Sequence, residues 1–411
     1  MGEKPLIAAV RRGDAEAVEA LLETGADPDA VDEHGTPALC LAVDAFDLPV
    51  AEALMSSAWL NRIAPDGRTP LLRAIDLGAC DITAALTHRG AHLWPKDAEG
   101  RDALELARYW HMRGTEAELR RRSGTSTSVG RRTVRHESET VCEELSLGGL
   151  TVRNGHTAIL TELEPRYGIT PSFAELMDRA LAEPDVDHEV WWATTYTLQQ
   201  RNDPTVWDAA AALRDRPDAL QRCFGAEVLR LAIVLDESDD ESFDRPLVDL
   251  ILPWVAREED PRVMRALTAG LVDALDPRAK QLLPTLTRHH DSEVRKWAVS
   301  GLHGPVAWGD PEALAAAIER TQDANAVVRV QACRALAEAP TDSPAPSNAL
   351  AACLHDEEEA VRVTAAVRLA LRDDPRGDEV LRGLNSTDQD SPYYWDLYDV
   401  WRHRETPSPA N

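Results

Sequence analysis

Two segments of the chain, DSEVRKWAVSGL at 291–302 and DPRVMRALTAGL at 260–271, match column for column and decide how the C-terminal half folds. Similar segments are DANAVVRVQACRAL at 323–336 and DEEEAVRVTAAVRLAL at 356–371, with a weaker DHEVWWATTYTL at 187–198. Four valines head these segments at spacings of 31, 34 and 33 residues: Val263, Val294, Val328 and Val361. Self-similarity at such a period indicates stacked helical repeats.

Each valine begins a stripe with the spacing i, i+4, i+8, as in Val294, Ala298 and Leu302. That spacing places the three side chains on one face of a helix, so we expect the stripe to be buried. An aspartate precedes each stripe and suits a helix N-terminus, because its carboxylate can accept hydrogen bonds from free backbone amides.

The pattern D-x-x-V-R-x-x-A-x-x-x-L resembles HEAT-type repeats, including the subtype named for phycobilin lyases. In that family the arginine pairs with an aspartate of the neighbouring repeat. The resemblance therefore implies a structural ladder of Asp291, Arg295, Asp323, Arg329, Asp356 and Arg362. Met264 and Trp191 stand in the arginine column and would interrupt it. We expect about six HEAT-like units over 171–400, in an array spanning 151–405, with an insertion at the acidic run 236–241.

The N-terminal part has its own repeat. DGRTPLLRA at 66–74 is echoed by DEHGTPALCLA at 32–42 and DAEGRDALELA at 97–107, and LLETGADPD stands at 21–29. Alanines recur at spacings of 33, 32 and 33 (Ala9, Ala42, Ala74 and Ala107) and would let paired helices approach closely. These segments resemble ankyrin repeats, and we place the repeats of this chain at 3–122. In that family partners bind at loop tips and inner helices; the corresponding tip positions are His34, Pro65 and Glu99.

Between the arrays, RRRSGTSTSVGRRTVRH at 120–136 contains six arginines and no acid. Its Ser, Thr and Gly content predicts a flexible linker over 123–150. The alternative is a binding arm for nucleic acid or an acidic partner. Leu147–Gly148–Gly149–Leu150 predicts a turn, and residues 406–411 predict a disordered tail. The expected fold is all-α, with two helical-repeat solenoids joined by a flexible linker.

Charge and cysteine content narrow the class of protein. The 411 residues include 71 acidic and 44 basic side chains, a net charge of -27, which disfavours general nucleic-acid binding. Residues 171–411 hold 44 acids and 25 bases, so most of the negative charge belongs to the HEAT-like array. Six dispersed cysteines without a C-x-x-C pair predict free thiols, no zinc site and a cytoplasmic location. From the sequence we expect neither a signal peptide nor a membrane helix. Few lysines and many alanines indicate a bacterial source.

Motifs that would carry catalysis or bind a cofactor are missing. The sequence has no phosphate-binding loop and no G-x-G-x-x-G or G-x-S-x-G motif. His136–Glu137 and His188–Glu189 begin like a zinc-protease motif but lack the second histidine. His289–His290–Asp291 is interpreted as a turn before a helix. We therefore expect no catalytic residue, no cofactor and no metal.

Aromatic residues are the better guide to function. The chain has 11 Trp and only four Phe, and Trp and Tyr anchor many protein interfaces. The candidate partner-binding residues, besides the ankyrin tips, are Trp191, Trp192, Trp297, Tyr393, Tyr394 and Trp395. The leading hypothesis is a non-enzymatic scaffold that binds proteins, with basic or Arg-rich segments as the expected partners. The alternatives are a HEAT-fold enzyme similar to DNA alkylpurine glycosylases or bilin lyases, and nucleic-acid binding through the arginine-rich linker.

Overall fold

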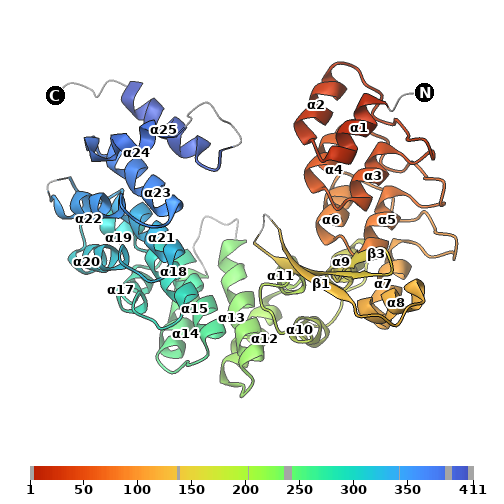
Figure 1. Ribbon diagram of the computed structural model, residues 1–411. Helices are drawn as coiled ribbons and strands as arrows, with labels where there is room; N and C mark the ends of the chain where they lie inside the picture. Colours follow the sequence, from red (N-terminus) through yellow and green to blue (C-terminus); the bar gives the residue numbers. More distant parts are fainter. Residues whose placement is uncertain are drawn as a thin grey trace. The chain divides into compact units, whose positions relative to one another are not determined.

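The computed structural model describes residues 4–136, 139–201, 203–235, 243–341, 343–384 and 391–405. The chain divides into two compact units, unit 1 at Met1–Val206 and unit 2 at Trp207–Asn411. Both are built mainly of helices, as the repeats predict, and a single three-stranded sheet in unit 1 is the departure among the described residues (Figure 1). The predicted insertion at 236–241 and the predicted tail at 406–411 lie outside the described residues.

Unit 1 begins with four helix pairs. They are α1 (Pro5–Arg12) and α2 (Ala15–Glu23), α3 (Ala38–Asp44) and α4 (Leu48–Met55), α5 (Pro70–Leu77) and α6 (Cys80–His88), and α7 (Ala103–Arg113) and α8 (Thr115–Ser123). The two helices of each pair pack together, and α1, α3, α5 and α7 stack in that order (Figure 1). Ala9, Ala42, Ala74 and Ala107 are fully buried, which is why these helices can pack closely.

Short polar side chains start the helices of these pairs. Asp14, Asp47 and Thr69 each accept a hydrogen bond from a backbone amide in the first turn of the helix that follows. Asp102 and Glu105 form a reciprocal capping box at α7. Each cap satisfies amides that have no partner within the helix.

Residues 130–153 form an antiparallel sheet of β1 (Gly130–Arg135), β2 (Val141–Leu147) and β3 (Leu150–Arg153). The predicted turn at Leu147–Leu150 joins β2 and β3, and Gly148 and Gly149 supply the positive φ angles of 61° and 81° that it needs. The flexible linker predicted for 123–150 is therefore wrong. Leu145, Leu147 and Val152 are buried, so the sheet has an apolar face that holds it on unit 1.

The six arginines of 120–136 are paired with carboxylates of α5, α8, β2 and the loop between β1 and β2, all within unit 1. Six ion pairs show this: Arg120–Glu116, Arg121–Glu118, Arg122–Asp76, Arg131–Glu143, Arg132–Glu144 and Arg135–Glu139. These carboxylates lower the net positive charge that the segment presents, which disfavours its use as a nucleic-acid arm.

Unit 1 continues through α9 (His156–Leu163), the 3-10 turn η1 (Glu164–Tyr167), α10 (Phe173–Leu181) and α11 (Glu189–Gln199). Helix α9 packs against α6, α7 and α11, so it extends the ankyrin stack. Arg179 is buried and forms an ion pair with Glu164 at 2.7 Å. The sequence placed 151–199 with the C-terminal array, whereas the contacts place these residues in unit 1.

Unit 2 contains α13 (Ala219–Val234), α15 (Pro261–Asp273), α18 (Ser292–Ser300), α21 (Ala326–Leu336) and α23 (Glu359–Ala370), each packed on the next. Val263, Val294, Val328 and Val361 are fully buried in these helices. The remaining elements are η2 (Ala212–Asp215), α14 (Asp244–Val255), α16 (Pro277–Lys280), α17 (Leu283–Leu286), α19 (His303–Ala307), α20 (Pro311–Arg320), α22 (Ala345–Cys353), η3 (Pro375–Gly377), α24 (Asp378–Arg382) and α25 (Tyr394–Glu405), with α12 (Pro204–Ala211) at the boundary between the units. None of the described helices has the length and apolar character that crossing a membrane requires.

Candidate functional site

The ankyrin tip residues lie on exposed turns of unit 1. His34, Pro65 and Glu99 are all exposed to solvent. The Asp32 carboxylate accepts hydrogen bonds from the backbone N–H groups of His34 and Thr36, at 2.9 and 2.8 Å. Asp32 therefore stabilises the turn, and the exposed His34 side chain is not needed to maintain the fold.

The two adjacent tryptophans of α11 have opposite environments. Trp191 is 3% exposed, and its indole N–H donates to the Glu183 carbonyl oxygen at 3.0 Å. Trp192 is 46% exposed, and its ring stacks on Tyr196 with 5.4 Å between ring centroids. Trp191 is therefore a core residue, and its assignment as a partner-binding residue is wrong. The two rings differ in exposure because neighbouring side chains on a helix point about 100° apart.

Trp192 and Tyr196 line a cavity of about 570 Å³ in unit 1. Its other charged or polar lining residues include His88, Glu162, Arg166 and Arg201. Burial raises the pKa of the Glu162 carboxyl to about 7. The cavity therefore combines an aromatic wall with a carboxyl group that can exchange a proton near neutral pH.

Of the aromatic candidates in unit 2, Trp297 and Tyr393 are half-buried. The Arg230 guanidinium lies over the Trp297 ring at 5.3 Å. Tyr393 packs against a small core that includes Val363 and Val400. These contacts assign both rings to packing within unit 2.

Helix α25 carries a row of aromatic side chains on its solvent face. Trp395 is 74% exposed, Tyr398 40% and Trp401 51%. Successive rings lie 6.0 and 5.6 Å apart between centroids, and Tyr394 contacts Trp395 at 5.2 Å. The opposite face of the helix buries Leu397 and Val400. We call Trp395, Tyr398 and Trp401 the α25 stripe; the sequence pointed to its first residue.

Arginines and aspartates connect consecutive repeats of unit 2. Arg295 binds Asp323 through Nε and Nη2, both at 2.8 Å. Arg329 binds Asp356 in the same way, at 2.8 and 2.7 Å. Each arginine thus reaches the acid of the following repeat.

The ends of this ladder are different. At the C-terminal end, Arg362 makes the backbone contact that all three arginines share: it donates to the carbonyl oxygens of Asp356 and Glu357, both at 2.8 Å, as Arg295 and Arg329 do to those of their own turns. Asp291 accepts from the amides of Glu293 and Val294 and so caps α18. The repeated pattern therefore fixes where the arginine lies in each repeat. Whether it also binds a carboxylate depends on which residue stands in the turn of the next repeat.

Replacing Arg329 with lysine is expected to lower the local stability of α21–α23 by about 2 kcal/mol, because a lysine cannot form the two-pronged contact with Asp356. Hydrogen exchange of the full chain, resolved by peptide, measures this loss. The matched control is Arg288→Lys, whose side chain is 60% exposed beside Glu319 and should change stability by less than about 0.5 kcal/mol. Equal effects of the two variants would contradict the ladder's role.

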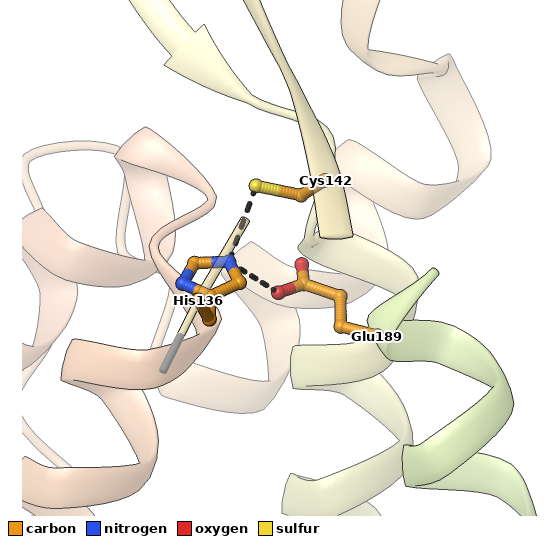
Figure 2. Close-up of side chains that lie close together, drawn as sticks. All are labelled: His136, Cys142 and Glu189. Atoms are coloured by element: carbon orange, nitrogen blue, oxygen red, sulfur yellow. Dashed lines mark hydrogen bonds and ion pairs between the residues drawn. The ribbon is translucent and has the colours of Figure 1, made fainter. Parts of the chain in front are cut away.

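A buried polar cluster lies where β2, the end of β1 and the start of α11 meet. His136 follows β1, Cys142 lies on β2, and Glu189 is the first residue of α11. Figure 2 shows one nitrogen of the imidazole facing both the thiol and the carboxylate. His136 Nε2 is 3.4 Å from Cys142 Sγ and 3.4 Å from Glu189 Oε2. On the other side of the ring, Nδ1 is 3.1 Å from Asp81 Oδ2.

Burial and ion pairing set the charge state of this cluster. The hydrogen bond to Asp81, with those to Cys142 and Glu189, raises the pKa of His136 to about 11. Burial raises the pKa of the Cys142 thiol and of the Glu189 carboxyl. Arg153, at 3.3 Å from Asp81 Oδ2, supplies the second positive charge. At neutral pH the cluster therefore holds a protonated imidazole and a protonated thiol.

Sequence reasoning missed this cluster. His136 and Glu189 each belong to a pair that was rejected because no histidine followed at the zinc-protease spacing. Cys142 was counted only as one of six dispersed thiols. The residues come together because Val141 pairs with His188 in a parallel bridge, and a contact between segments 47 residues apart leaves no local pattern.

Family comparisons agree with the helix arrangement. A family model of ankyrin repeats (3 copies) matches residues 6–97, and a model of HEAT repeats matches residues 314–393. No sequence among curated proteins matches the chain. Together with the stacked helix pairs of unit 1 and the consecutive helices of unit 2, these matches show that the chain contains ankyrin repeats at 6–97 and HEAT repeats at 314–393, in that order.

Proposed function

We propose that the protein is a non-enzymatic scaffold that binds a partner protein through the α25 stripe. Ankyrin and HEAT repeats generally serve as protein-interaction scaffolds. The observation that carries the proposal is the exposure of Trp395, Tyr398 and Trp401 in one continuous row. Lone exposed aromatic residues are common, whereas a row of them on one helix face is typical of a binding surface.

Charge around the stripe favours a basic partner segment. Residues 356–405 contain 13 acidic and seven basic side chains. Asp373, which pairs with His403 of α25, has an 87% exposed side chain, and Glu357, Glu358 and Glu359 are exposed around the start of α23. Arginine and lysine side chains of a partner would lie over the aromatic rings and pair with these carboxylates. We therefore propose an Arg- or Lys-rich protein segment as the occupant.

A non-enzymatic role is supported by the kind of fold and by the state of the cysteines. The nearest approach to a catalytic arrangement in the described residues is Cys142 beside His136, and this thiol is 1% exposed with a raised pKa. A nucleophilic cysteine requires a lowered pKa and access to substrate. All six cysteines are buried free thiols, which supports a reducing, cytoplasmic location as part of the proposal.

Affinity enrichment from the native host tests the proposal. Full-length wild-type chain is compared with the double variant Trp395→Ala/Trp401→Ala, which removes two exposed rings without opening the core. We expect a discrete protein with a basic segment to be enriched at least 10-fold less by the double variant, since each central aromatic contributes about 2 kcal/mol. Added salt should weaken its binding.

The control is Trp308→Ala, because Trp308 is 83% exposed and has no place in the stripe. This variant should enrich the partner as well as the wild type does. If the double variant retains every protein that the wild type binds, the stripe is not the binding surface. If the double variant differs from the wild type only in the solution mass of the assembly that the chain forms with itself, the stripe serves self-association instead.

A further inference from the structure

The ligand-type atoms of His136, Cys142 and Glu189 lie close together. His136 Nε2, Cys142 Sγ and a Glu189 carboxylate oxygen all lie within 4.8 Å of one another. A tetrahedral zinc ion, with bonds of about 2.0 to 2.3 Å, holds its ligand atoms about 3.3 to 3.8 Å apart. The two distances of 3.4 Å from His136 Nε2 fall in that range.

Ion pairing of His136 with Asp81 and Glu189 leaves its contact with Cys142 unexplained. Nε2 of an imidazole carries at most one hydrogen and points it in one direction. Here the same nitrogen faces both a thiol and a carboxylate at equal distance (Figure 2). One N–H group cannot donate well to both, whereas a cation at the centre would contact all three atoms.

The Asp81 side chain orients the imidazole as histidine ligands of zinc are oriented. Asp81 Oδ2 lies 3.1 Å from His136 Nδ1, so the other ring nitrogen, Nε2, faces Cys142 and Glu189. Asp81 is itself held by Arg153 and by the backbone amide of Ile82, at 3.3 and 2.8 Å. A carboxylate bound to the far nitrogen fixes the tautomer and direction of a metal-binding histidine.

The Glu189 carboxylate is buried and only partly satisfied, because Oε2 faces His136 Nε2 while Oε1 lies toward Gly155. Its residue is 5% exposed, and Oε1 has no hydrogen-bond partner. An unpaired buried carboxylate oxygen is costly unless a partner satisfies it. Gly155 makes room for this side chain, because a Cβ there would lie 2.1 Å from Oε1.

We propose that His136, Cys142 and Glu189 bind one Zn²⁺ ion, with Asp81 as the residue that positions His136. A thiolate, an imidazole and a carboxylate together suit zinc and not magnesium or calcium, which take oxygen ligands. A water molecule would complete the four ligands. Binding releases the thiol proton and the imidazolium proton, so the +2 charge of the ion replaces two protons and the net charge of the cluster is unchanged.

Zinc bound at this position would link three segments of the chain. The ion would connect the end of β1, strand β2 and the first turn of α11, all within unit 1. Since zinc binds the folded arrangement, it should raise the thermal stability of that unit. This proposal is independent of partner binding by the α25 stripe.

The test uses the full-length chain, freed of metal by a chelator and titrated with Zn²⁺ and Co²⁺. We expect one ion per chain for each metal, and a thiolate-to-cobalt charge-transfer absorption that reports Cys142 as a ligand. Cys142→Ser should lose that absorption. Asp81→Asn should keep it while weakening Zn²⁺ binding about 10- to 100-fold, as expected for a residue that only positions a ligand.

Cys40→Ser is the matched control, because Cys40 is also a buried free thiol of unit 1 but lies in α3. It should bind both metals as the wild type does. Circular dichroism establishes that each variant is folded. The wild-type chain alone can overturn the proposal, because failure to bind one equivalent of Co²⁺, or binding without the thiolate absorption, excludes this site whatever the variants do.

Discussion

Alanine at Gly78 is expected to lower the stability of unit 1 by about 2 to 5 kcal/mol. Gly78 ends α5 with a φ of 68°, which a residue with a Cβ adopts only at a cost. The added Cβ would lie 2.0 Å from the Arg153 carbonyl oxygen and 2.8 Å from His156 Cε1. The variant therefore forces β3 and the start of α9 away from the third helix pair.

Gly90→Ala separates the two causes. Gly90 has a similar φ of 87°, but a Cβ there meets nothing within 4 Å. It should cost only the conformational term, about 1 to 2 kcal/mol. Hydrogen exchange of the full chain, read on peptides from α5, β3 and α9, measures both variants. Equal losses for Gly78→Ala and Gly90→Ala would mean that β3 does not pack on Gly78 as described.

Removing the Asp76 carboxylate is the second change with a large expected effect. Asp76 is buried and accepts hydrogen bonds from Arg122 Nη1 and Nη2 at 2.7 and 2.8 Å. It also accepts from Arg68 Nη1 at 2.8 Å and from the Trp110 indole N–H at 2.9 Å. Asp76→Ala removes the acceptor of Arg68 and of the Trp110 indole and leaves Arg122 with Glu118 as its remaining carboxylate, at 2.8 Å, so we expect a loss of about 3 kcal/mol.

The dependence on pH has a defined sign. Burial alone would raise the pKa of Asp76, but the hydrogen bonds from Arg122 and the charge of Arg68 outweigh burial and lower it. The carboxylate therefore stabilises the fold above its unfolded pKa, and this contribution is lost as the pH falls through the folded value. Wild-type unit 1 should lose stability over that acidic range, and the Asp76→Ala variant should lose less.

Asp66→Ala is the control for Asp76. The Asp66 side chain is 40% exposed and binds Arg73, which also binds Asp44. Its removal should cost no more than about 1 kcal/mol. Peptides from α5, α7 and α8 report the difference by hydrogen exchange. Similar losses for both variants would show that the Asp76 network is not the contact that holds α8 on the ankyrin helices.

The repeats could be predicted because their information is local. The buried valines of unit 2 and the buried alanines of unit 1 recur at fixed spacings, so a single chain reveals which faces are buried. The turn at Gly148–Gly149 was also predictable, because two adjacent glycines permit the positive φ angles of a tight hairpin.

The sheet could not be predicted in the same way. Strand β1 has mostly exposed side chains, so it shows little of the alternation that marks a strand. Its arginines looked unpaired because their acids, such as Glu116 and Glu144, lie outside the run or on the neighbouring strand. The composition of the segment was typical of a linker, and only contacts distant in sequence give it structure.

The candidate sites show the same difference between local patterns and contacts distant in sequence. Trp395 was found because aromatic residues are dense near it, and Trp192 because one of two neighbours on a helix must face outward. The cluster of His136, Cys142 and Glu189 was missed because it depends on three segments that meet only in the folded unit. Sequence alone therefore predicts periodic features better than sites built from distant residues.

Photo-crosslinking at Tyr398 tests the central claim most directly. A photoreactive phenylalanine analogue replaces Tyr398, in the middle of the α25 stripe, or Trp308, an exposed residue elsewhere in unit 2. Each full-length chain is irradiated with the protein enriched by the wild type. The account predicts a crosslink from position 398 to a basic segment of that partner and none from position 308. A bound partner that gives no crosslink at 398, or an equal one at 308, would contradict it.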